Sequence, residues 1–135
     1  MSTIVSYKVG QVVPHEEVCK NYKIGCMGGI RYSKENNVVV LFHLANQSYY
    51  SDYWDGDVFY YVGMGKGDQS ELYLSNRRIT ESENKGTSIH LFERIIDEKC
   101  EYIGEMRLSG KPVYRKAKDK KGVEFTQVLF PLKKK

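Results

Sequence analysis

Short apolar stretches follow one another along this sequence, separated by polar or glycine-containing turns, and only two segments have a helical pattern. The clearest apolar run, residues 38–44, predicts a buried strand. Because strands follow strands instead of alternating with helices, the sequence predicts an α+β fold with a mostly antiparallel, strongly curved sheet, and it disfavours a doubly wound parallel sheet. The other expected strands cover residues 4–13, 58–63, 87–93, 101–108, 113–118 and 123–132.

Two helices are expected beside this sheet. The first begins at Pro14, because proline suits a first helical turn, and Glu16 and Glu17 are favourable near a helix N-terminus. It should end near Tyr22. The second helix is expected over residues 70–84, before a glycine that can end it.

The size and composition of the chain fit a single domain, residues 1–135. Hydrophobic residues make up 41% of the sequence and charged residues 28%, as in ordinary globular proteins. The sequence has neither an apolar run of about 18 residues nor a basic leader followed by an apolar segment. We therefore expect a cytoplasmic protein with no membrane partner.

The cysteines and histidines do not form a recognisable metal motif. Three cysteines cannot all pair, and the separation of the first two fits no common zinc pattern, which favours buried free thiols. The histidines lie far apart in the sequence. We expect neither a metal nor another cofactor. These residues are Cys19, Cys26 and Cys100, with His15, His43 and His90.

The segment 49–63 combines many aromatic residues with several carboxylates, which is unusual for a core strand. Tyr49 and Tyr61 could form a slot that stacks a nucleic-acid base, a contact worth roughly 1–3 kcal/mol. Asp52 could accept a hydrogen bond from an exocyclic amine, such as cytosine N4. Alternatively, the aromatic residues are half-buried structural side chains and Asp52 caps a turn. The residues alone leave both interpretations open.

The formal net charge is +4, with most of the excess near the C-terminus. Residues 111–135 contain nine Lys/Arg and two Asp/Glu. This pattern is compatible with a polyanionic partner. It also fits a solvated hairpin followed by a frayed tail, so charge alone does not decide between phosphate contact and ordinary surface charge.

The order of short motifs along the chain resembles that of the SRA (SET- and RING-associated, or YDG) domain. The similarity covers about residues 7–132, and it is greatest to the compact bacterial version found beside HNH nuclease domains in McrA-like, modification-dependent restriction enzymes. In order, the motifs are Gly-Gly-Ile at 28–30, the apolar run at 38–44, Tyr49 with Asp52, Asp-Gly at 55–56, Phe-Tyr-Tyr-Val-Gly at 59–63, Gly-Asp-Gln at 67–69, Asn-Arg-Arg-Ile at 76–79, Thr-Ser-Ile-His-Leu-Phe-Glu at 87–93, and a final Tyr-Ile-Gly with a basic hairpin.

The resemblance implies a PUA-like curved β-barrel with two flanking helices. It also implies a module that binds duplex DNA and flips a modified cytosine, 5-methylcytosine or 5-hydroxymethylcytosine, into an aromatic pocket. The family pattern places the stacking rings at Tyr49 and Tyr61, the cytosine-reading carboxylate at Asp52 and the closing glycine at Gly63. Val62 stands where well-known members have threonine, which leaves the modifying group open.

The DNA contacts expected around this pocket come from flanking segments. Met27 is a candidate apolar wedge for the gap in the duplex, although it fits a core position equally well. Arg31, Lys66 and Arg77 are candidate phosphate contacts, with surface charge as the alternative; Arg77 also belongs to a segment that is more scaffold than pocket in the family. The loop after Gly63 is short, so a preference between hemi- and fully modified sites is not implied.

The sequence offers little support for catalysis. It contains no HNH motif, no Asp…Glu-x-Lys motif and no Ser/His/Asp arrangement, so any nuclease activity is expected from a partner or a further domain. We therefore expect a reader domain of a modification-dependent restriction system. Two alternatives remain: a PUA-like RNA-binding module that reads a modified base in a single strand, and a catalytic or small-ligand domain on the same fold.

Overall fold

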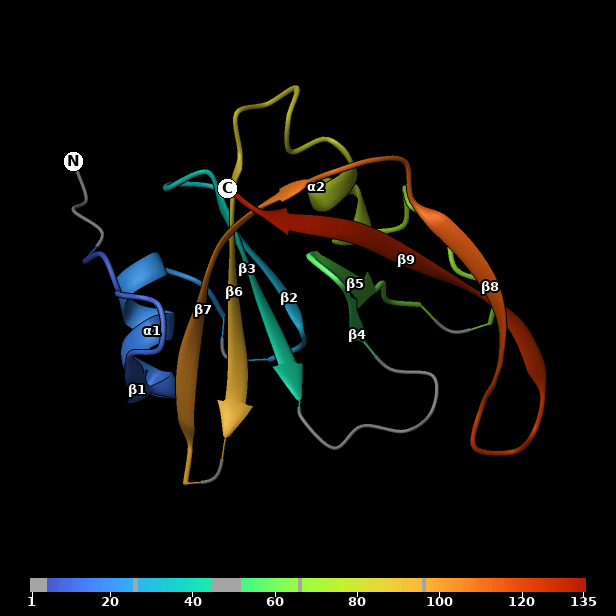
Figure 1. Cartoon of the computed structure of the whole chain (residues 1–135), viewed down its shortest axis with the longest axis horizontal. Coiled ribbons are helices and arrows are strands. Elements are labelled where there is room, and N and C mark those ends of the chain that lie inside the picture. Colours follow the sequence, from blue (N-terminus) through green and yellow to red (C-terminus); the bar gives the residue numbers. More distant parts are fainter. Residues whose placement is uncertain (1–4, 26, 45–51, 66, 96) are drawn as a thin grey trace.

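The computed structural model describes residues 5–25, 27–44, 52–65, 67–95 and 97–135 (Figure 1). Strands dominate, and two short helices accompany them. The elements in chain order are β1 (Val12–Pro14), α1 (His15–Tyr22), β2 (Ile30–Ser33), β3 (Val38–Leu44), β4 (Tyr53–Asp55), β5 (Val58–Val62), α2 (Asn76–Thr80), β6 (Ser88–Ile95), β7 (Lys99–Leu108), β8 (Val113–Lys118) and β9 (Glu124–Lys134).

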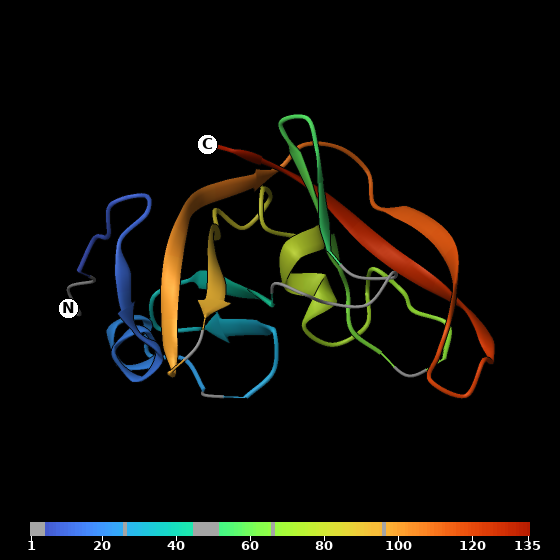
Figure 2. The ribbon, with the colours of Figure 1, turned by 60° about the horizontal axis from the view of Figure 1, so that its bottom comes forward.

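The described strands form one sheet in the order β2-β3-β6-β7-β9-β5-β4, with β1 paired to β7 and β8 paired to β9. Only the β3–β6 pair is parallel among these described pairs. The sheet bends strongly, and β9 crosses the end of β7 to reach β5 (Figure 2). The predicted α+β fold with a curved, mostly antiparallel sheet is confirmed.

The run of apolar residues in β3 is explained by burial on both faces of the sheet. Val39 and Leu41 point into a core that also holds Phe59, Tyr61 and Phe130. The alternate residues of β3 point to the opposite face, where α1 covers them. Because successive side chains of a strand point to opposite faces, a strand buried on both sides needs apolar residues throughout.

The first helix agrees with the prediction, since α1 follows Pro14 directly and ends at Tyr22. The strand expected over residues 4–13 is wrong in extent, because only Val12–Pro14 is strand among the described residues. Gly10 has φ +89°, and the backbone N–H of Gln11 donates to the carbonyl of Lys8. This turn interrupts the extended backbone.

The second helix is much shorter than expected. The structure has α2 only at Asn76–Thr80, with turns on both sides, instead of a helix over residues 70–84. Leu72 and Leu74 are exposed, so they do not form an apolar face with the buried Ile79. Neither described helix is long and apolar enough to span a membrane.

Two strands, β2 and β4, have no counterpart in the sequence-based expectations. β2 pairs with β3 and forms one edge of the sheet, and β4 pairs with β5 at the other edge. β4 lies within the segment 49–63 that was expected to form the pocket, and β2 pairs with the strand that precedes this segment. Their presence fixes the backbone on either side of the candidate site.

Candidate nucleic-acid interface

Asp52 lies at the centre of a small hydrogen-bonded cluster. Its Oδ1 accepts a hydrogen bond from the backbone N–H of Val62 at 2.7 Å. Its Oδ2 lies 2.9 Å from Nδ1 of His43. The side chains of His43 and Asp52 are 18% and 12% exposed, so the carboxylate is largely removed from water. A carboxylate in such a place needs these donors, because burying an unpaired charge is costly.

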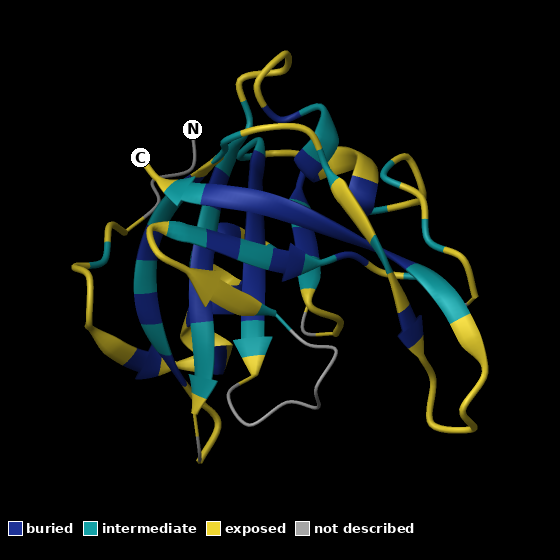
Figure 3. Ribbon diagram, turned by 45° about the vertical axis from the view of Figure 1, so that its right-hand side comes forward, coloured by how far each residue is buried: buried dark blue, intermediate teal, exposed yellow. Residues whose placement is uncertain are grey.

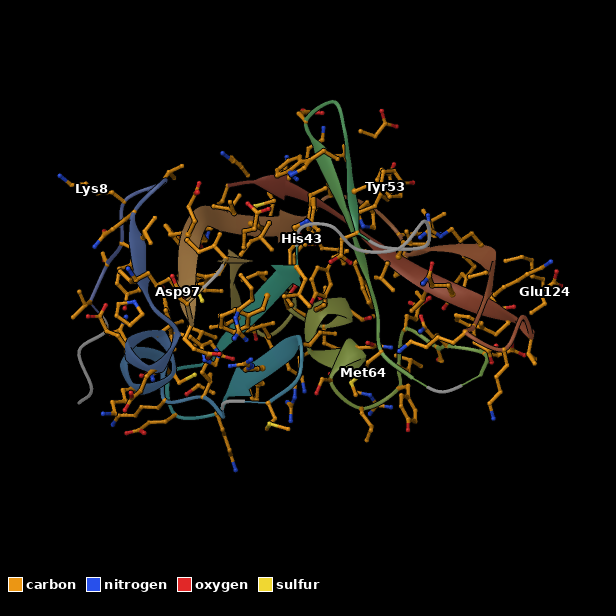
Figure 4. All side chains as sticks on the ribbon, turned by 90° about the horizontal axis from the view of Figure 1, so that it is seen from below. Lys8, His43, Tyr53, Met64, Asp97 and Glu124 are labelled. Atoms are coloured by element: carbon orange, nitrogen blue, oxygen red, sulfur yellow. The ribbon has the colours of Figure 1, made fainter. Side chains whose placement is uncertain are left out.

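His43 was not among the predicted site residues. It lies near the end of β3, beside the hairpin that carries Tyr53 (Figure 4), and its ring meets Phe59 edge-on at 5.2 Å. Because a carboxylate accepts, the hydrogen on the imidazole faces Asp52 from Nδ1. Nothing in the sequence pointed to this contact, since nine residues separate the two side chains and no helical spacing relates them.

Tyr61 is a core residue in this structure. It is 3% exposed, and its hydroxyl donates to the carbonyl of Phe42 at 3.1 Å. Burial, reinforced by the neighbouring Asp52 carboxylate, raises the pKa of the phenol, so it remains a neutral donor. The structure therefore differs from an open stacking wall at this position, because the ring has almost no free surface.

Gly29 is required by the position of Tyr61. A Cβ atom added at Gly29 would lie 2.7 Å from the hydroxyl oxygen of Tyr61. The carbonyl of Gly29 also accepts a hydrogen bond from the backbone N–H of Phe42. Glycine at this position thus lets the loop after α1 pack directly against the predicted pocket ring.

Gly63 is the point where β5 approaches β9 too closely for a side chain. A Cβ atom there would lie 2.6 Å from Cγ1 of Val128 and 3.0 Å from Oδ1 of Asn76. The backbone N–H of Gly63 donates to the carbonyl of Val128. Val62, the preceding residue, is only partly buried, and its backbone holds Asp52.

Asn76 holds the segment that follows the closing glycine. It is fully buried, and its Oδ1 accepts from the backbone N–H of Met64 while its Nδ2 donates to the carbonyls of Met64 and Ser70. This bridging pattern uses the side-chain amide as a substitute for a strand partner. The observation agrees with the expectation that the 76–79 segment is scaffold.

Met27 lies on the surface and is 86% exposed. This excludes the alternative in which Met27 is a core residue. Arg31 holds the loop around Met27 by two hydrogen bonds. Its Nε donates to the carbonyl of Gly28, and its Nη1 donates to the carbonyl of Gly25.

Arg31 does not lie where a phosphate contact requires it. It is 5% exposed, its Nη1 lies 2.7 Å from Nε2 of His15, and its guanidinium carbon stands 4.1 Å from the centroid of the Phe42 ring. The prediction of a phosphate contact at Arg31 is therefore corrected, because the guanidinium is buried and used within the protein. Its role is to position the loop that carries Met27.

The remaining predicted residues have different outcomes. Arg77 is exposed at the start of α2, where it can face a partner, and its Nε makes a long hydrogen bond of 3.4 Å to the carbonyl of Leu72. Tyr49 and Lys66 lie outside the described residues. The structure thus brings Asp52, Val62 and Tyr61 together, and it separates Arg31 from the surface.

The cysteines give no sign of a metal centre. Cys19 and Cys100 are buried, as expected, and Cys26 lies outside the described residues. Burial raises the pKa of the Cys100 thiol, although Arg94 and Arg31 oppose this shift. Within the described part of the chain, no group of three His, Cys, Asp or Glu side chains is arranged to hold a metal ion.

Comparison of the fold with solved structures identifies its class as the SRA type of PUA-like fold. A structure of the sulfur binding domain and SRA domain of ScoMcrA complexed with phosphorothioated DNA is similar, with a TM-score of 0.73 and 14% identity over 96% of this chain and 40% of that chain. ScoMcrA, a Type IV phosphorothioation-dependent restriction endonuclease, also matches with a TM-score of 0.72 and 17% identity over 95% of this chain and 28% of that chain.

Another similar structure covers nearly the whole of both chains. The SUVH5 SRA domain bound to fully hydroxymethylated CG DNA has a TM-score of 0.68 and 20% identity over 100% of this chain and 93% of that chain. No curated protein sequence matches this chain. The sequence of residues 9–134 matches the family model described as "ScoMcrA-like, SRA domain", and the chain belongs to this family. It spans less than half the length of the two ScoMcrA chains.

Proposed function

We propose that this chain binds duplex DNA and reads a modified cytosine that has been flipped out of the double helix. The observation that carries the proposal is the Asp52 carboxylate, held from two sides by His43 and by the backbone of Val62. The SRA domains of similar fold are complexed with methylated and hydroxymethylated DNA, which supports the same class of partner here.

Asp52 supplies the selectivity for cytosine. A carboxylate has about four lone-pair sites, two on each oxygen, so each oxygen can accept more than one hydrogen bond. Cytosine N4 can donate to it, whereas thymine presents a carbonyl at the same edge and faces the carboxylate with no hydrogen to donate. Reversing this contact costs on the order of 1–3 kcal/mol.

The flipped base stacks between Tyr49 and Tyr61 in this proposal. Flipping costs a few kcal/mol of lost stacking and pairing, and two aromatic faces offset much of it. Tyr61 is 3% exposed without DNA, so the side chains around its ring part when the base enters. The neutral phenol and its hydrogen bond to the carbonyl of Phe42 fix the ring at its hydroxyl end.

Met27 fills the space that the base leaves in the duplex. The exposed side chain of Met27 is the apolar wedge, and two hydrogen bonds from Arg31 hold its loop. Arg77, exposed beside α2, contacts phosphate in the same complex, as does Lys66. Such contacts make the affinity fall steeply with salt.

The biological role proposed is specificity within a modification-dependent restriction system in the cytoplasm. The chain corresponds to 28% of the length of the ScoMcrA endonuclease, so the cleaving activity belongs to another domain or a partner nuclease. The domain itself acts as a reader without catalysis. Because Val62 carries no hydroxyl, the proposal covers both a methyl and a hydroxymethyl group at cytosine C5.

The test is a competition experiment by fluorescence anisotropy at fixed salt. Duplexes of one sequence carry cytosine, 5-methylcytosine, 5-hydroxymethylcytosine or thymine at one position, beside a phosphorothioated duplex and a matched RNA. We expect the modified cytosines to bind at least about tenfold tighter than the others. Equal binding of modified and unmodified duplexes overturns the proposal, and stronger binding of the RNA favours an RNA-binding module instead.

The matched variant is Asp52→Asn, which keeps the shape of the side chain and removes its charge. It should lose the preference for modified cytosine over thymine and retain weak, salt-sensitive binding. A 2-aminopurine next to the target base reports the flipping separately, because its fluorescence rises when the neighbouring base leaves the stack. An unchanged preference in the variant would show that another residue reads the base.

A further inference from the structure

The positive charge of this chain is concentrated in one hairpin. Residues 111–127, named the hairpin arm below, contain six Lys/Arg and two Asp/Glu. Its net charge of +4 equals the net charge of the entire chain, so all the other residues together sum to zero. The arm comprises β8, the following turn and the first part of β9. A polyanion is therefore attracted mainly to this arm.

The four lysines near the tip of the arm are exposed and take part in none of the ion pairs between described residues. Lys116, Lys118, Lys120 and Lys121 are all exposed, as the yellow outer part of the hairpin in Figure 3 illustrates. None of the ion pairs between described residues involves them, and Lys116 donates only to the neutral Thr126 hydroxyl. The same ion pairs do use other lysines of the chain, such as Lys20 and Lys85.

The nearest carboxylate in the turn is occupied by backbone groups. Oδ1 of Asp119 accepts hydrogen bonds from the backbone N–H groups of Lys121 and Val123. These bonds close the turn and give Asp119 a structural role. The Asp119 carboxylate thus holds the turn closed, while Lys120 and Lys121 in the turn remain exposed.

The arm begins at the candidate site. Val62 lies opposite Leu129 in the β5–β9 pair, and the backbone N–H of Gly63 donates to the carbonyl of Val128. From Val128 the strand runs outward to the turn at Gly122, six residues away in the sequence. At about 3.3 Å per residue, the tip lies up to about 20 Å from the pocket, a reach of about six base pairs along a duplex.

Side-chain contacts fasten the base of the arm to the segments around the site. Nε of Arg115 donates to Gln127 at 2.6 Å, and its guanidinium carbon stands 5.5 Å from the centroid of the Tyr53 ring. Tyr53, which follows Asp52 directly, is itself stacked on Tyr60 at 5.0 Å. A contact chain of this kind keeps the arm at a fixed place beside the carboxylate.

A second set of bonds joins the arm to the short loop after Gly63. Oδ1 of Asp68 accepts from the backbone N–H of Thr126, and Oε1 of Gln69 accepts from the backbone N–H of Val128. The hydroxyl of Tyr114 donates to Glu71. The loop is therefore tied along the arm and does not project as a finger of its own.

We propose that the hairpin arm is a second DNA-contact surface, which lies along the phosphate backbone on one flank of the flipped base. The proposal rests on the proposed function of the domain. Lys116, Lys118, Lys120 and Lys121 supply the contacts, and these are independent of sequence and of modification. The arm raises the affinity for all duplexes equally, while discrimination stays with Asp52.

The experiment measures the salt dependence of binding for a variant with the four lysines replaced by glutamine. A slope of about 0.9 in log affinity against log salt per phosphate contact predicts a slope smaller by about two to four, and affinity weaker by about a hundredfold or more at about 0.1 M salt. The ratio between modified and unmodified duplexes should not change. A matched control replaces Lys8, Lys20, Lys34 and Lys99, which are equally exposed and lie elsewhere, and should change the slope by less than about one.

Duplex length gives a second readout for the same variant. Wild-type protein should bind a duplex with about ten base pairs beside the modified cytosine more tightly than one with about three, and the arm variant should lose this gain. A wild-type slope in the arm variant, or an equal loss in the control, overturns the arm proposal. If the wild-type protein shows no preference for the modified base, the proposed function is refuted instead. The two failures are therefore distinguishable.

Discussion

Nδ1 of His43 lies 2.9 Å from Oδ2 of Asp52, while the other carboxylate oxygen, Oδ1, accepts the backbone N–H of Val62 at 2.7 Å. One carboxylate therefore joins the end of β3, the start of β4 and the last residue of β5. The two bonds fix both the position and the rotation of the carboxylate plane. A hydrogen-bonding group that reads a base needs this pre-organisation, because each misdirected contact loses selectivity.

Replacement of His43 tests whether this bond orients Asp52. In His43→Asn the side-chain amide nitrogen occupies about the place of Nδ1, so selectivity for modified cytosine over thymine should stay within about threefold of wild type. In His43→Gln the nitrogen lies one bond further out, and in His43→Leu it is absent. Both should lose roughly tenfold in selectivity, the effect of removing one donor from a largely buried carboxylate.

The control for His43 is His90→Asn, which changes a second partly buried histidine that contacts the hydroxyl of Tyr102 on the opposite face of the sheet. Binding selectivity is measured as the ratio of dissociation constants for duplexes that differ in one base. Comparable losses in His43→Asn and His43→Leu would contradict the orienting role, because only the latter removes the donor.

Close packing at two glycines predicts a difference between otherwise similar substitutions. Gly63→Ala places a Cβ atom 2.6 Å from Cγ1 of Val128, and Gly29→Ala places one 2.7 Å from the hydroxyl oxygen of Tyr61. Each should lower the free energy of unfolding by about 1–3 kcal/mol through overpacking. Gly25→Ala is the control, since nothing lies within 4 Å of its added Cβ atom.

Urea denaturation of the three glycine variants gives the comparison directly. The two tight positions should shift the midpoint to lower urea with an unchanged slope, whereas Gly25→Ala should stay close to wild type. Gly29→Ala should also weaken binding of the modified duplex, because it displaces the hydroxyl of Tyr61. A wild-type midpoint for Gly63→Ala would mean that β5 and β9 separate at little cost.

A strand was predictable from the sequence where both of its faces are buried. The run at residues 38–44 is apolar throughout because both of its faces are covered, and the structure has β3 at Val38–Leu44. β4 was missed although Gly56 follows an aspartate, the signal of a tight hairpin, and Gly56 has φ +62°. The helix expected over residues 70–84 is interrupted because Leu74 has φ +44°, which an α-helix does not allow, and because the backbone N–H of Tyr73 donates to the carbonyl of Ser70 in a turn.

The site was predictable only in part, since long-range contacts are invisible in sequence. The motif order placed Asp52 and Val62 in one site, and the structure brings them within hydrogen-bonding distance. His43 was missed because its partner Asp52 lies nine positions further along the chain, just before β4. Arg31 was placed on the surface by its charge, but its guanidinium is buried against His15 and Phe42.

Two histidines away from the Asp52 cluster, the buried His15 and the partly buried His90, predict how stability depends on pH. Burial lowers the pKa of His15 below its ordinary value of 6.5, with Arg94 and Arg31 acting in the same direction and Glu98 opposing them. Burial also lowers the pKa of His90, against the opposing effect of Glu105. Below pH about 6.5 the unfolded chain therefore binds more protons than the folded one.

The stabilising effect of these neutral histidines is complete above pH about 6.5 and is lost as the pH falls toward their folded pKa values. The free energy of unfolding should drop by at most about 1.4 kcal/mol per pH unit for each histidine. Urea denaturation between pH 7.5 and 5 checks this. His15→Gln and His90→Gln should each flatten the pH profile of stability. If both variants keep the wild-type profile, these histidines are not the groups that cause the pH dependence.

Met27 tests the wedge on the surface of the domain. At 86% exposed, it contributes little to stability, so Met27→Ala should leave the urea midpoint unchanged. If the side chain fills the gap in the duplex, the variant should bind modified duplex about three- to tenfold more weakly and raise the 2-aminopurine fluorescence less. Val9→Ala, another substitution of an exposed apolar residue at 64% exposure, should change neither signal. Wild-type flipping in Met27→Ala would assign the gap-filling role to another residue, and it would leave the two hydrogen bonds from Arg31 to this loop with a purely structural purpose.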